Sequence, residues 1–220
     1  MSDILEVIRS RRTIRKFSPK SVEWDKISRV LDAGRHAPSA GNLQDWKFIV
    51  ILEEELKMQL AEASLQQYFM VQAPIFIVVC SEPEKIIRYY GARGEKLYSV
   101  QNNAACVQNM LLAAHALGLG TCWIGAFDED EVRRVLNIPA DARPQAIICL
   151  GYPGESPKQP PKYPLETLVF FNSWKNKIRD PTAYLQNYSD VLRKKTQGAV
   201  KQIKTFIDEK IKRKEPEEGP

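Results

Sequence analysis

The sequence predicts an α/β fold with one main domain, and three observations support this. The chain has 220 residues, of which 44% are hydrophobic and 27% are charged, which is enough apolar material for one sizeable core. Short β-branched apolar runs alternate with longer segments that have helical spacing. Residues 95–117 contain neither Gly nor Pro, and 104–117 are apolar nearly all round, so a long central helix is predicted there. This alternation does not by itself require a doubly wound sheet.

Further helices are predicted where apolar residues recur at helical spacing. Asp3 is placed to cap the first one, with Glu6 three residues later. The last of these segments is amphipathic and reads as one or two helices. The predicted helical ranges are 3–10, 23–36, 53–66, 128–136 and 185–214.

Buried strands are predicted where short apolar runs are bounded by turn-forming residues. Four such runs cover residues 48–52, 74–80, 121–125 and 145–152. A fifth extended run, residues 168–171, is isolated behind a proline-rich loop. An exposed apolar strand of this kind is an aggregation hazard unless another strand pairs with it.

The net charge of +5 belongs to the C-terminal part of the chain. Residues 193–214 carry nine Lys or Arg and two Asp or Glu, whereas residues 1–192 are close to neutral. The predicted organisation is therefore a main domain over residues 1–180 and a helical, basic extension over 181–220. A near-neutral body without a stacking-aromatic motif argues against nucleic acid as a partner.

Other features of the chain indicate its compartment. No stretch is long and apolar enough to span a membrane, and the first residues show no signal pattern. Four cysteines, none in a CxxC pair, lie in apolar runs and read as small buried hydrophobes: Cys80, Cys106, Cys122 and Cys149. A cytoplasmic protein that does not contact membranes is the expectation.

Several common catalytic motifs are missing from the sequence. There is no P-loop, no HExxH and no Cys/His cluster with metal-ligand spacing. Gly118-Leu119-Gly120 follows a predicted helix and precedes a predicted strand, and a dinucleotide fingerprint requires the reverse order. The remaining candidates are anion-binding and turn motifs.

The first candidate motif combines Arg11, Arg12, Thr13 and Arg15. Three guanidinium groups and a hydroxyl within five residues match the donors that bind a phosphate. The alternative interpretation is a solvated basic helix end.

Three more motifs follow along the chain, and each could also be an ordinary turn. In the loop 38–46, Ser39, Asn42 and Gln44 offer uncharged hydrogen-bonding groups. Glycines at both ends of residues 118–125 would let a flat molecule approach that strand, or would simply form a tight helix-to-strand turn. The last motif is Gly151-Tyr152-Pro153-Gly154, followed by Lys162 in a proline-rich loop.

In this order, the four segments resemble the nitroreductase family from about Ile4 to Trp174. The resemblance rests on RRTIRKF, APSAGNLQDW, GLGTCWIG and LGYPGE…KYPL. It implies a nitroreductase-like α+β fold with a central mixed, mainly antiparallel sheet flanked by helices. It also implies a homodimer whose subunits exchange their C-terminal strands.

The resemblance further implies non-covalent FMN and the residues that bind it. The phosphate and ribityl chain would be bound by Arg11, Arg12, Thr13 and Arg15, with Lys162 as a late phosphate ligand. A loop from the partner subunit would lie against the flavin, and a strand would border its ring system. The loop residues are Pro38, Ser39, Ala40, Asn42 and Gln44, and the strand residues are Trp123, Ile124 and Gly125.

The sequence departs from the family pattern at three of these positions. Thr13 stands where Ser is common, which keeps the hydroxyl. Asp45 stands where Pro is common after the Gln. Lys162 stands where Arg is usual, so the bidentate fork is lost.

The implied function is that of a flavoprotein oxidoreductase. FMN would take hydride from NAD(P)H and reduce a small organic electron acceptor, such as a nitroaromatic, a quinone or a flavin, by a ping-pong mechanism, with no catalytic side chain. Segments 53–72 and 84–98 are expected to form the lid over the acceptor. The alternative is a non-catalytic flavin- or nucleotide-binding regulatory module, or a nucleic-acid-binding protein that uses the basic segments.

Overall fold

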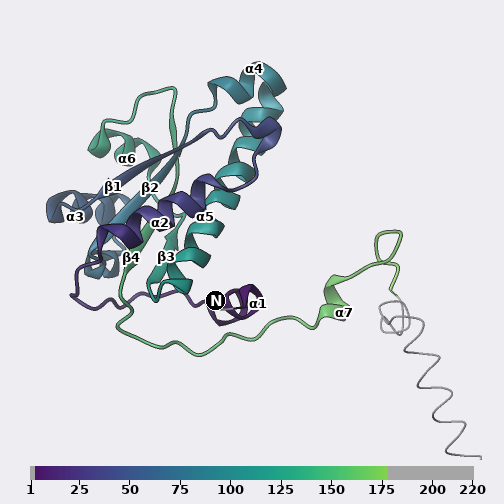
Figure 1. Ribbon diagram of the computed structural model, residues 1–220. Helices are drawn as coiled ribbons and strands as arrows, with labels where there is room; N and C mark the ends of the chain where they lie inside the picture. The colour runs from purple at the N-terminus through teal and green to yellow at the C-terminus, as the bar shows by residue number, and fades with distance from the viewer. Residues whose placement is uncertain (1–2, 178–220) are drawn as a thin grey trace, which may run out of the picture. The chain divides into compact units, whose positions relative to one another are not determined.

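The computed structural model describes residues 3–177, in two compact units that are each described by themselves (Figure 1). Among the described residues, the first unit is 3–159 and the second is 160–177. The predicted extension, 181–220, and its predicted helix over 185–214 lie outside the described residues.

The first unit is built on a four-stranded sheet, and the four predicted strands are confirmed. The strands are β1 (Trp46–Ile51), β2 (Ile75–Ser81), β3 (Gly120–Ile124) and β4 (Arg143–Gly151), in the order β1-β2-β4-β3. Every neighbouring pair is antiparallel. The expected parallel component of the sheet is thus limited, among residues 3–177, to one isolated bridge between Thr13 and Thr121.

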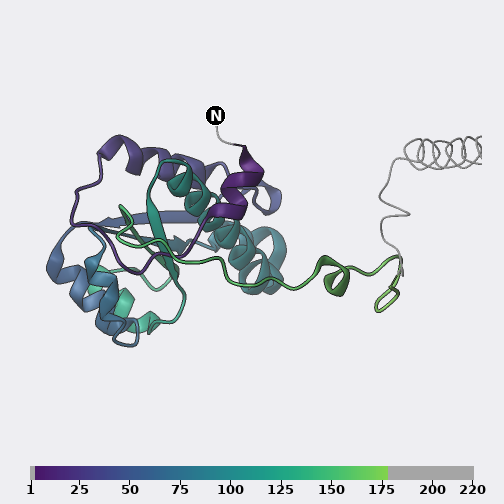
Figure 2. The same cartoon turned by 90° about the horizontal axis from the view of Figure 1, so that it is seen from below.

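Helices cover both faces of the sheet, as Figures 1 and 2 show. On one face lie α2 (Trp24–Arg35) and α5 (Ser99–Ala116), and on the other lie α3 (Glu54–Ala63) and α6 (Glu129–Leu136). Every residue of β2 is buried, because successive side chains point to opposite faces and both faces are covered. Two hydrophobic clusters result, one on each side of the sheet.

The predicted long helix is α5, and its apolar side chains are central to the core as expected. Cys106, Val107, Met110 and Ala114 are each fully buried. The helix ends at Ala116, and Gly118 follows its cap residue with a φ of +77°, the left-handed conformation that closes many helices.

The first helix, α1 (Ile4–Ser10), starts where Asp3 accepts a hydrogen bond from the Leu5 amide at 3.1 Å. Val7 is its only buried residue. Ile4, Leu5 and Ile8 are 60%, 53% and 49% exposed, so most of the apolar face predicted for this helix is uncovered in the single chain.

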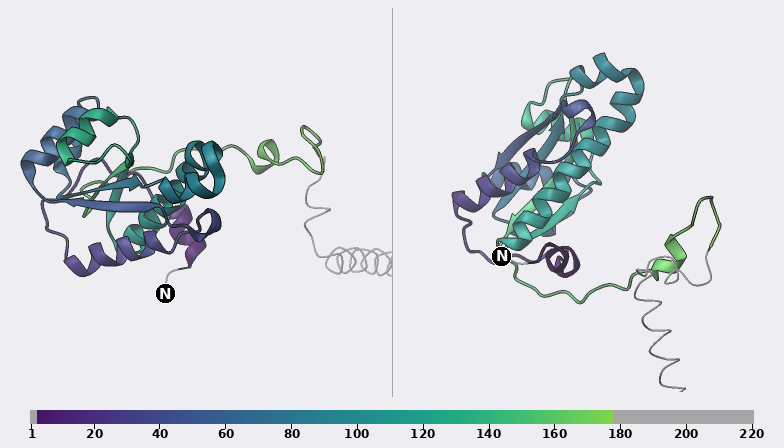
Figure 3. Two further views of the ribbon diagram at one scale, coloured as in Figure 1. Left: turned by 90° about the horizontal axis from the view of Figure 1, so that it is seen from above. Right: turned by 45° about the vertical axis from the view of Figure 1, so that its right-hand side comes forward.

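Three helical segments of the first unit were not predicted as elements: η1 (Ala40–Asn42), η2 (Tyr68–Gln72) and α4 (Glu84–Arg93). The start of the helix predicted over 95–117 forms a π-helical turn, η3 (Gly94–Tyr98), that leads directly into α5. In the right-hand view of Figure 3, α4 lies beyond the N-terminal end of α5. The chain bends within the last turn of α4, at Gly91, with φ of 58° and ψ of −150°, a conformation that only glycine adopts readily.

The prediction of an extended run over residues 168–171 is wrong for the single chain. In the second unit, Leu168 ends a short helix, α7 (Leu165–Leu168). The Phe171 amide donates to the Asn176 carbonyl at 2.9 Å, and the Phe170 and Trp174 rings meet edge to face. The chain therefore turns back on itself locally over residues 171–176.

Candidate functional site

Residues 11–16, here called the clamp segment, form an extended stretch after α1. The Ile14 amide donates to the Thr121 carbonyl at 2.9 Å, which attaches the segment to the edge strand β3. On the other side, the Gly154 amide donates to the Lys16 carbonyl at 2.8 Å. The segment is thus held between β3 and the chain that follows β4, and its backbone conformation is defined from both sides.

Glu155 completes this attachment and was not identified from the sequence. Its Oε1 accepts hydrogen bonds from the amides of Arg15 at 2.6 Å and Lys16 at 3.0 Å. These bonds lower the pKa of the Glu155 carboxyl below its ordinary value of 4.5, and the nearby charges of Lys16 and Arg15 add to the effect. The only signal in the sequence is its position, directly after the turn Gly151–Gly154.

The guanidinium groups of the clamp segment have different surroundings. Arg12 donates through Nη1 to the carbonyls of Arg9 and Arg11, at 2.7 and 2.8 Å, and so satisfies the end of α1. Arg15 is exposed, with its guanidinium 5.9 Å from the centre of the Phe69 ring. Among residues 3–177, neither Arg11 nor Arg15 makes an ion pair or a side-chain hydrogen bond. These two groups are therefore available to an anion.

The positive potential near this segment affects the neighbouring His115. Its Nε2 lies 2.8 Å from Ser10 Oγ. Burial lowers the pKa of His115, and the charges of Arg11 and Arg12 lower it further. Burial would disfavour an anion too, so only the part of this shift that Arg11 and Arg12 cause reports a positive potential.

The three glycines around β3 are required, or left open, for different structural reasons. A Cβ on Gly120 would lie 2.8 Å from Ile14 Cγ1, so this glycine makes room for the clamp segment. Gly118 follows the end of α5. For these two positions the structure supports the tight helix-to-strand turn. At Gly125 the nearest atom to an added Cβ is Trp123 Nε1 at 3.8 Å, so the backbone there is open to a ligand.

The three candidate residues at the end of β3 do not share one face. Trp123 is 40% exposed and Gly125 is exposed, while Ile124 is 3% exposed and packs in the core. This follows from the alternation of side chains along a strand. Only the backbone of Ile124 can border a ligand, whereas Trp123 can do so with its side chain.

The candidate loop, residues 38–44, leads into β1 and contains the single turn η1. Pro38, Asn42 and Gln44 are exposed, and Ser39 and Ala40 are half-buried. The Gln44 amide donates to Ser39 Oγ at 3.1 Å, and the Gln44 side chain donates to Asn42 Oδ1 at 3.2 Å. The loop is internally bonded and still presents polar groups to solvent.

A single chain does not bring the clamp segment and this loop together. The clamp segment lies along β3, and the loop precedes β1, which is the opposite edge of the sheet. Three strand spacings separate these edges, or about 14 Å. The pairing register also puts Thr121 and Trp46 at opposite ends of the sheet.

The remaining candidates are less constrained. Lys162 is exposed in the second unit, so its role stays a prediction. Tyr68, Tyr89 and Tyr90 are exposed, as a lid over a site requires. The Tyr90 hydroxyl would lie 2.7 Å from a Cβ on Gly41, so Tyr90 covers part of the candidate loop.

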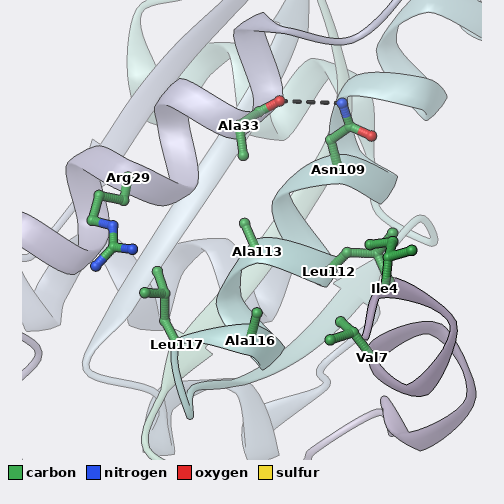
Figure 4. A pocket seen from close by; sticks show the side chains of 9 residues that line it. All are labelled: Ile4, Val7, Arg29, Ala33, Asn109, Leu112, Ala113, Ala116 and Leu117. Carbon is green, nitrogen blue, oxygen red and sulfur yellow. Dashed lines mark hydrogen bonds between the residues drawn. The ribbon is translucent and has the colours of Figure 1, made fainter. Parts of the chain in front are cut away.

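A groove of about 650 Å³ lies elsewhere, between α1, α2 and α5 (Figure 4). Ile4 and Val7 of α1 face Leu112, Ala113 and Ala116 of α5 across it. Apart from Arg29, which pairs with Asp25, and Asn109, its lining is apolar and does not suit a phosphate. Within residues 3–177 there is no cluster of His, Cys, Asp or Glu that could hold a metal ion, and no helix is long and apolar enough to cross a membrane.

Comparisons with known proteins place this arrangement in context. The profile described as "Nitroreductase family" matches residues 8–69 and 61–152. A protein of Methanothermobacter thermautotrophicus, named NADH dehydrogenase/NAD(P)H nitroreductase, is 38% identical over 161 residues, which cover 70% of this chain and 80% of that protein.

Two solved structures extend the likeness to the fold. A protein from Parabacteroides distasonis with the same name has a TM-score of 0.70 and 27% identity, over 79% of this chain and all of that one. A protein named FMN-dependent nitroreductase from Clostridium difficile has a TM-score of 0.67 and 27% identity, over 77% of this chain and 99% of that one.

Proposed function

The chain belongs to the nitroreductase family, and we propose that it is an oxidoreductase that holds FMN non-covalently, with NAD(P)H as electron donor and a small organic molecule as acceptor. Nitroaromatics, quinones and free flavins are the proposed acceptor classes. The observation that carries the proposal is the clamp segment, which presents Arg11 and Arg15 from a backbone attached on both sides.

The residues present fit this cofactor. The guanidinium groups of Arg11 and Arg15, which make no ion pair within residues 3–177, and the Thr13 hydroxyl supply donors for a phosphate. The open backbone at Gly125 and the exposed Trp123 supply a flat, partly apolar border for an aromatic ring system. When bound, FMN supplies hydride and electron transfer between donor and acceptor, which no side chain here can supply.

The tasks left to the protein are binding, orientation and exclusion of water. Arg11, Thr13 and Arg15 bind the phosphate, and Lys162 adds a charge to it. Trp123 and the backbone of Ile124 and Gly125 orient the ring system. Donor and acceptor use one site in turn, which gives ping-pong kinetics, and no catalytic acid or base is assigned.

The test compares FMN with riboflavin, which lacks the phosphate. A charge-assisted hydrogen bond contributes about 1.5–3 kcal/mol, so Arg11→Ala or Arg15→Ala should weaken FMN binding about tenfold or more and riboflavin binding much less. Arg35→Ala is the matched control, since Arg35 is an exposed arginine that pairs with Asp32 on α2. Equal losses for both flavins would refute the phosphate assignment, and a protein that binds neither flavin would refute the proposed function.

We also propose that the active form is a homodimer with two flavin sites, each built from both chains. The separation of the clamp segment from the loop 38–44 supports this, because one flavin could contact both only if the loop came from a second copy. The exposed Ile4, Leu5 and Ile8 and the apolar groove beside them supply a surface that a second copy would cover. The C-terminal strand exchange expected of the family belongs to the same proposal.

Light scattering at micromolar concentration tests the dimer directly. A mass near twice 25.1 kDa is expected, and unfolding should depend on protein concentration. A monomer that retains tightly bound FMN would contradict the proposal. We further propose a cytoplasmic location, since all four cysteines are free and buried.

A further inference from the structure

A buried carboxylate lies between the loop 38–44 and the sheet. Asp45 is 4% exposed. Its Oδ1 accepts from Asn102 Nδ2 at 2.8 Å, and its Oδ2 accepts from Ser99 Oγ at 2.5 Å and Asn103 Nδ2 at 3.3 Å. Within residues 3–177, no Lys or Arg forms an ion pair with it. Burying a charge without a cation nearby is unfavourable unless hydrogen bonds satisfy it. The three donors from α5 therefore stabilise the buried carboxylate.

Asn102 connects this carboxylate to the loop. Its Oδ1 accepts from the Ala40 amide at 2.9 Å while its Nδ2 donates to Asp45. An amide side chain has one acceptor oxygen and one donor nitrogen, so the carboxylate sets which way Asn102 points. If Asn102 turned over, its oxygen would face Asp45 and its NH₂ would face the Ala40 amide.

The loop needs such a constraint because its backbone is strained. Gly41, Asn42 and Gln44 have φ values of 57°, 56° and 50°. Residues other than glycine rarely adopt this left-handed conformation, and they keep it only where the surroundings impose it. The Ala40 amide lies at the start of the strained stretch, where one hydrogen bond from α5 determines its direction.

We propose that Asp45 is a positioning residue that, through Asn102, holds the loop 39–44 in the conformation that contacts the flavin. The last part of this statement rests on the proposed function. In the family pattern a proline is common at this position, and proline has no side-chain acceptor. This chain therefore uses a buried polar relay, Asp45 to Asn102 to the Ala40 amide.

A pair of substitutions separates this relay from simple packing. Asn102→Asp removes the donor to Asp45 and places two carboxylates face to face, and their repulsion should turn the side chain at 102 away from Asp45 and from the Ala40 amide. In the swap Asp45→Asn with Asn102→Asp, the new amide at 45 donates to the carboxylate at 102, and its oxygen accepts from Ser99 and Asn103. The carboxylate at 102 accepts from the Ala40 amide, so every hydrogen bond returns with the charge moved. Gln108→Ala, an exposed amide on the same helix, is the control.

Hydrogen–deuterium exchange of the Ala40 amide in flavin-free protein is the first measurement. Asn102→Asp should speed exchange about tenfold, as expected for the loss of one hydrogen bond and a new repulsion. The swap should restore slow exchange, and Gln108→Ala should leave it unchanged. Equal exchange in Asn102→Asp and the wild type, or no recovery in the swap, would overturn the relay.

The second measurement is the dissociation constant for FMN in the same proteins. It should rise about tenfold in Asn102→Asp and recover in the swap. If Ala40 exchange changes in the variants as predicted but FMN affinity does not, Asp45 positions the loop, and the proposal that the loop contacts the flavin is wrong. Should the wild type fail to bind FMN, the proposed function fails, and the exchange data still decide the relay.

Discussion

Two glycines of one motif should differ in how an added methyl group affects the stability of the protein. In Gly120→Ala the new Cβ would meet Ile14 Cγ1 at 2.8 Å and Ile14 Cβ at 3.0 Å. Ile14 cannot easily move, because it is 6% exposed, its side chain is β-branched and its amide is bonded to Thr121. Overpacking of this kind typically costs about 1–3 kcal/mol. For a protein of this size, that corresponds to a fall in Tm of about 2–12 °C.

In Gly125→Ala the added Cβ has only Trp123 Nε1 nearby, at 3.8 Å. Stability should therefore stay within about 0.5 kcal/mol of the wild type. If the flavin borders this strand, the methyl group lies between the ring and the backbone, and FMN affinity should fall on the order of tenfold, or about 1.4 kcal/mol.

Thermal unfolding of flavin-free protein and titration with FMN distinguish the two effects. Gly120→Ala should lower Tm, and it should also weaken FMN because Ile14 belongs to the clamp segment. Gly125→Ala should weaken FMN at unchanged Tm. Unchanged FMN affinity in Gly125→Ala would remove residues 123–125 from the site.

Three further predictions concern Glu155 and the cysteines. The pKa of Glu155 is lowered in the folded protein, so its stabilising contribution is present above the unfolded pKa and is lost as pH falls through the folded pKa. The Tm difference between wild type and Glu155→Gln should therefore shrink from pH 7 toward pH 3. A Tm difference that grows in acid would contradict this. Burial raises the pKa of Cys80 to about 11 and of Cys106 to about 12, so thiol reagents at pH 8 should label these cysteines only after unfolding. Cys106→Ala, Cys122→Ala and Cys149→Ala should alter stability and leave flavin reduction by NAD(P)H intact, whereas a loss of turnover in a folded, flavin-loaded variant would indicate thiol chemistry.

The elements that could be predicted from the sequence are those whose local pattern agrees with their packing. β2 is an unbroken apolar run because helices cover both faces, and α5 is apolar on most sides because it lies between the sheet and α2. By contrast, α4 was missed because Gly91 and Gly94 interrupt its pattern. Gly94 is close to Ile86, where a Cβ would meet side-chain and backbone atoms at 2.6 Å, and this contact is invisible in a linear sequence.

The types of residue at the site could be predicted from the sequence, but the role of each residue could not. Arg11, Arg12 and Arg15 look alike in the sequence, yet Arg12 donates to backbone carbonyls at the end of α1. Ile124 was grouped with Trp123 and Gly125, although alternation along the strand turns its side chain into the core. Glu155 and Asp45 act through tertiary hydrogen bonds to segments more than 50 residues away, and no local pattern marks such contacts.

A mixing experiment follows from the separation of the clamp segment and the loop within one chain. Suppose that each flavin site takes its clamp segment from one subunit and its loop 38–44 from the other. Arg15→Ala damages the clamp segment, and Asn42→Gly removes a loop side chain while glycine keeps the φ of 56° without strain. Each variant alone has two damaged sites per dimer, so both should bind FMN weakly.

In a heterodimer of the two variants, one site combines the intact clamp segment of the Asn42→Gly subunit with the intact loop of the Arg15→Ala subunit. The other site carries both defects. Refolding an equal mixture should give about half heterodimers, so about a quarter of all sites should regain wild-type affinity for FMN. Titration would then show a tight phase of that size, absent when either variant is refolded alone. If each subunit instead holds its flavin with its own clamp segment and its own loop, mixing restores nothing, and the two-chain site is refuted even where light scattering shows a dimer.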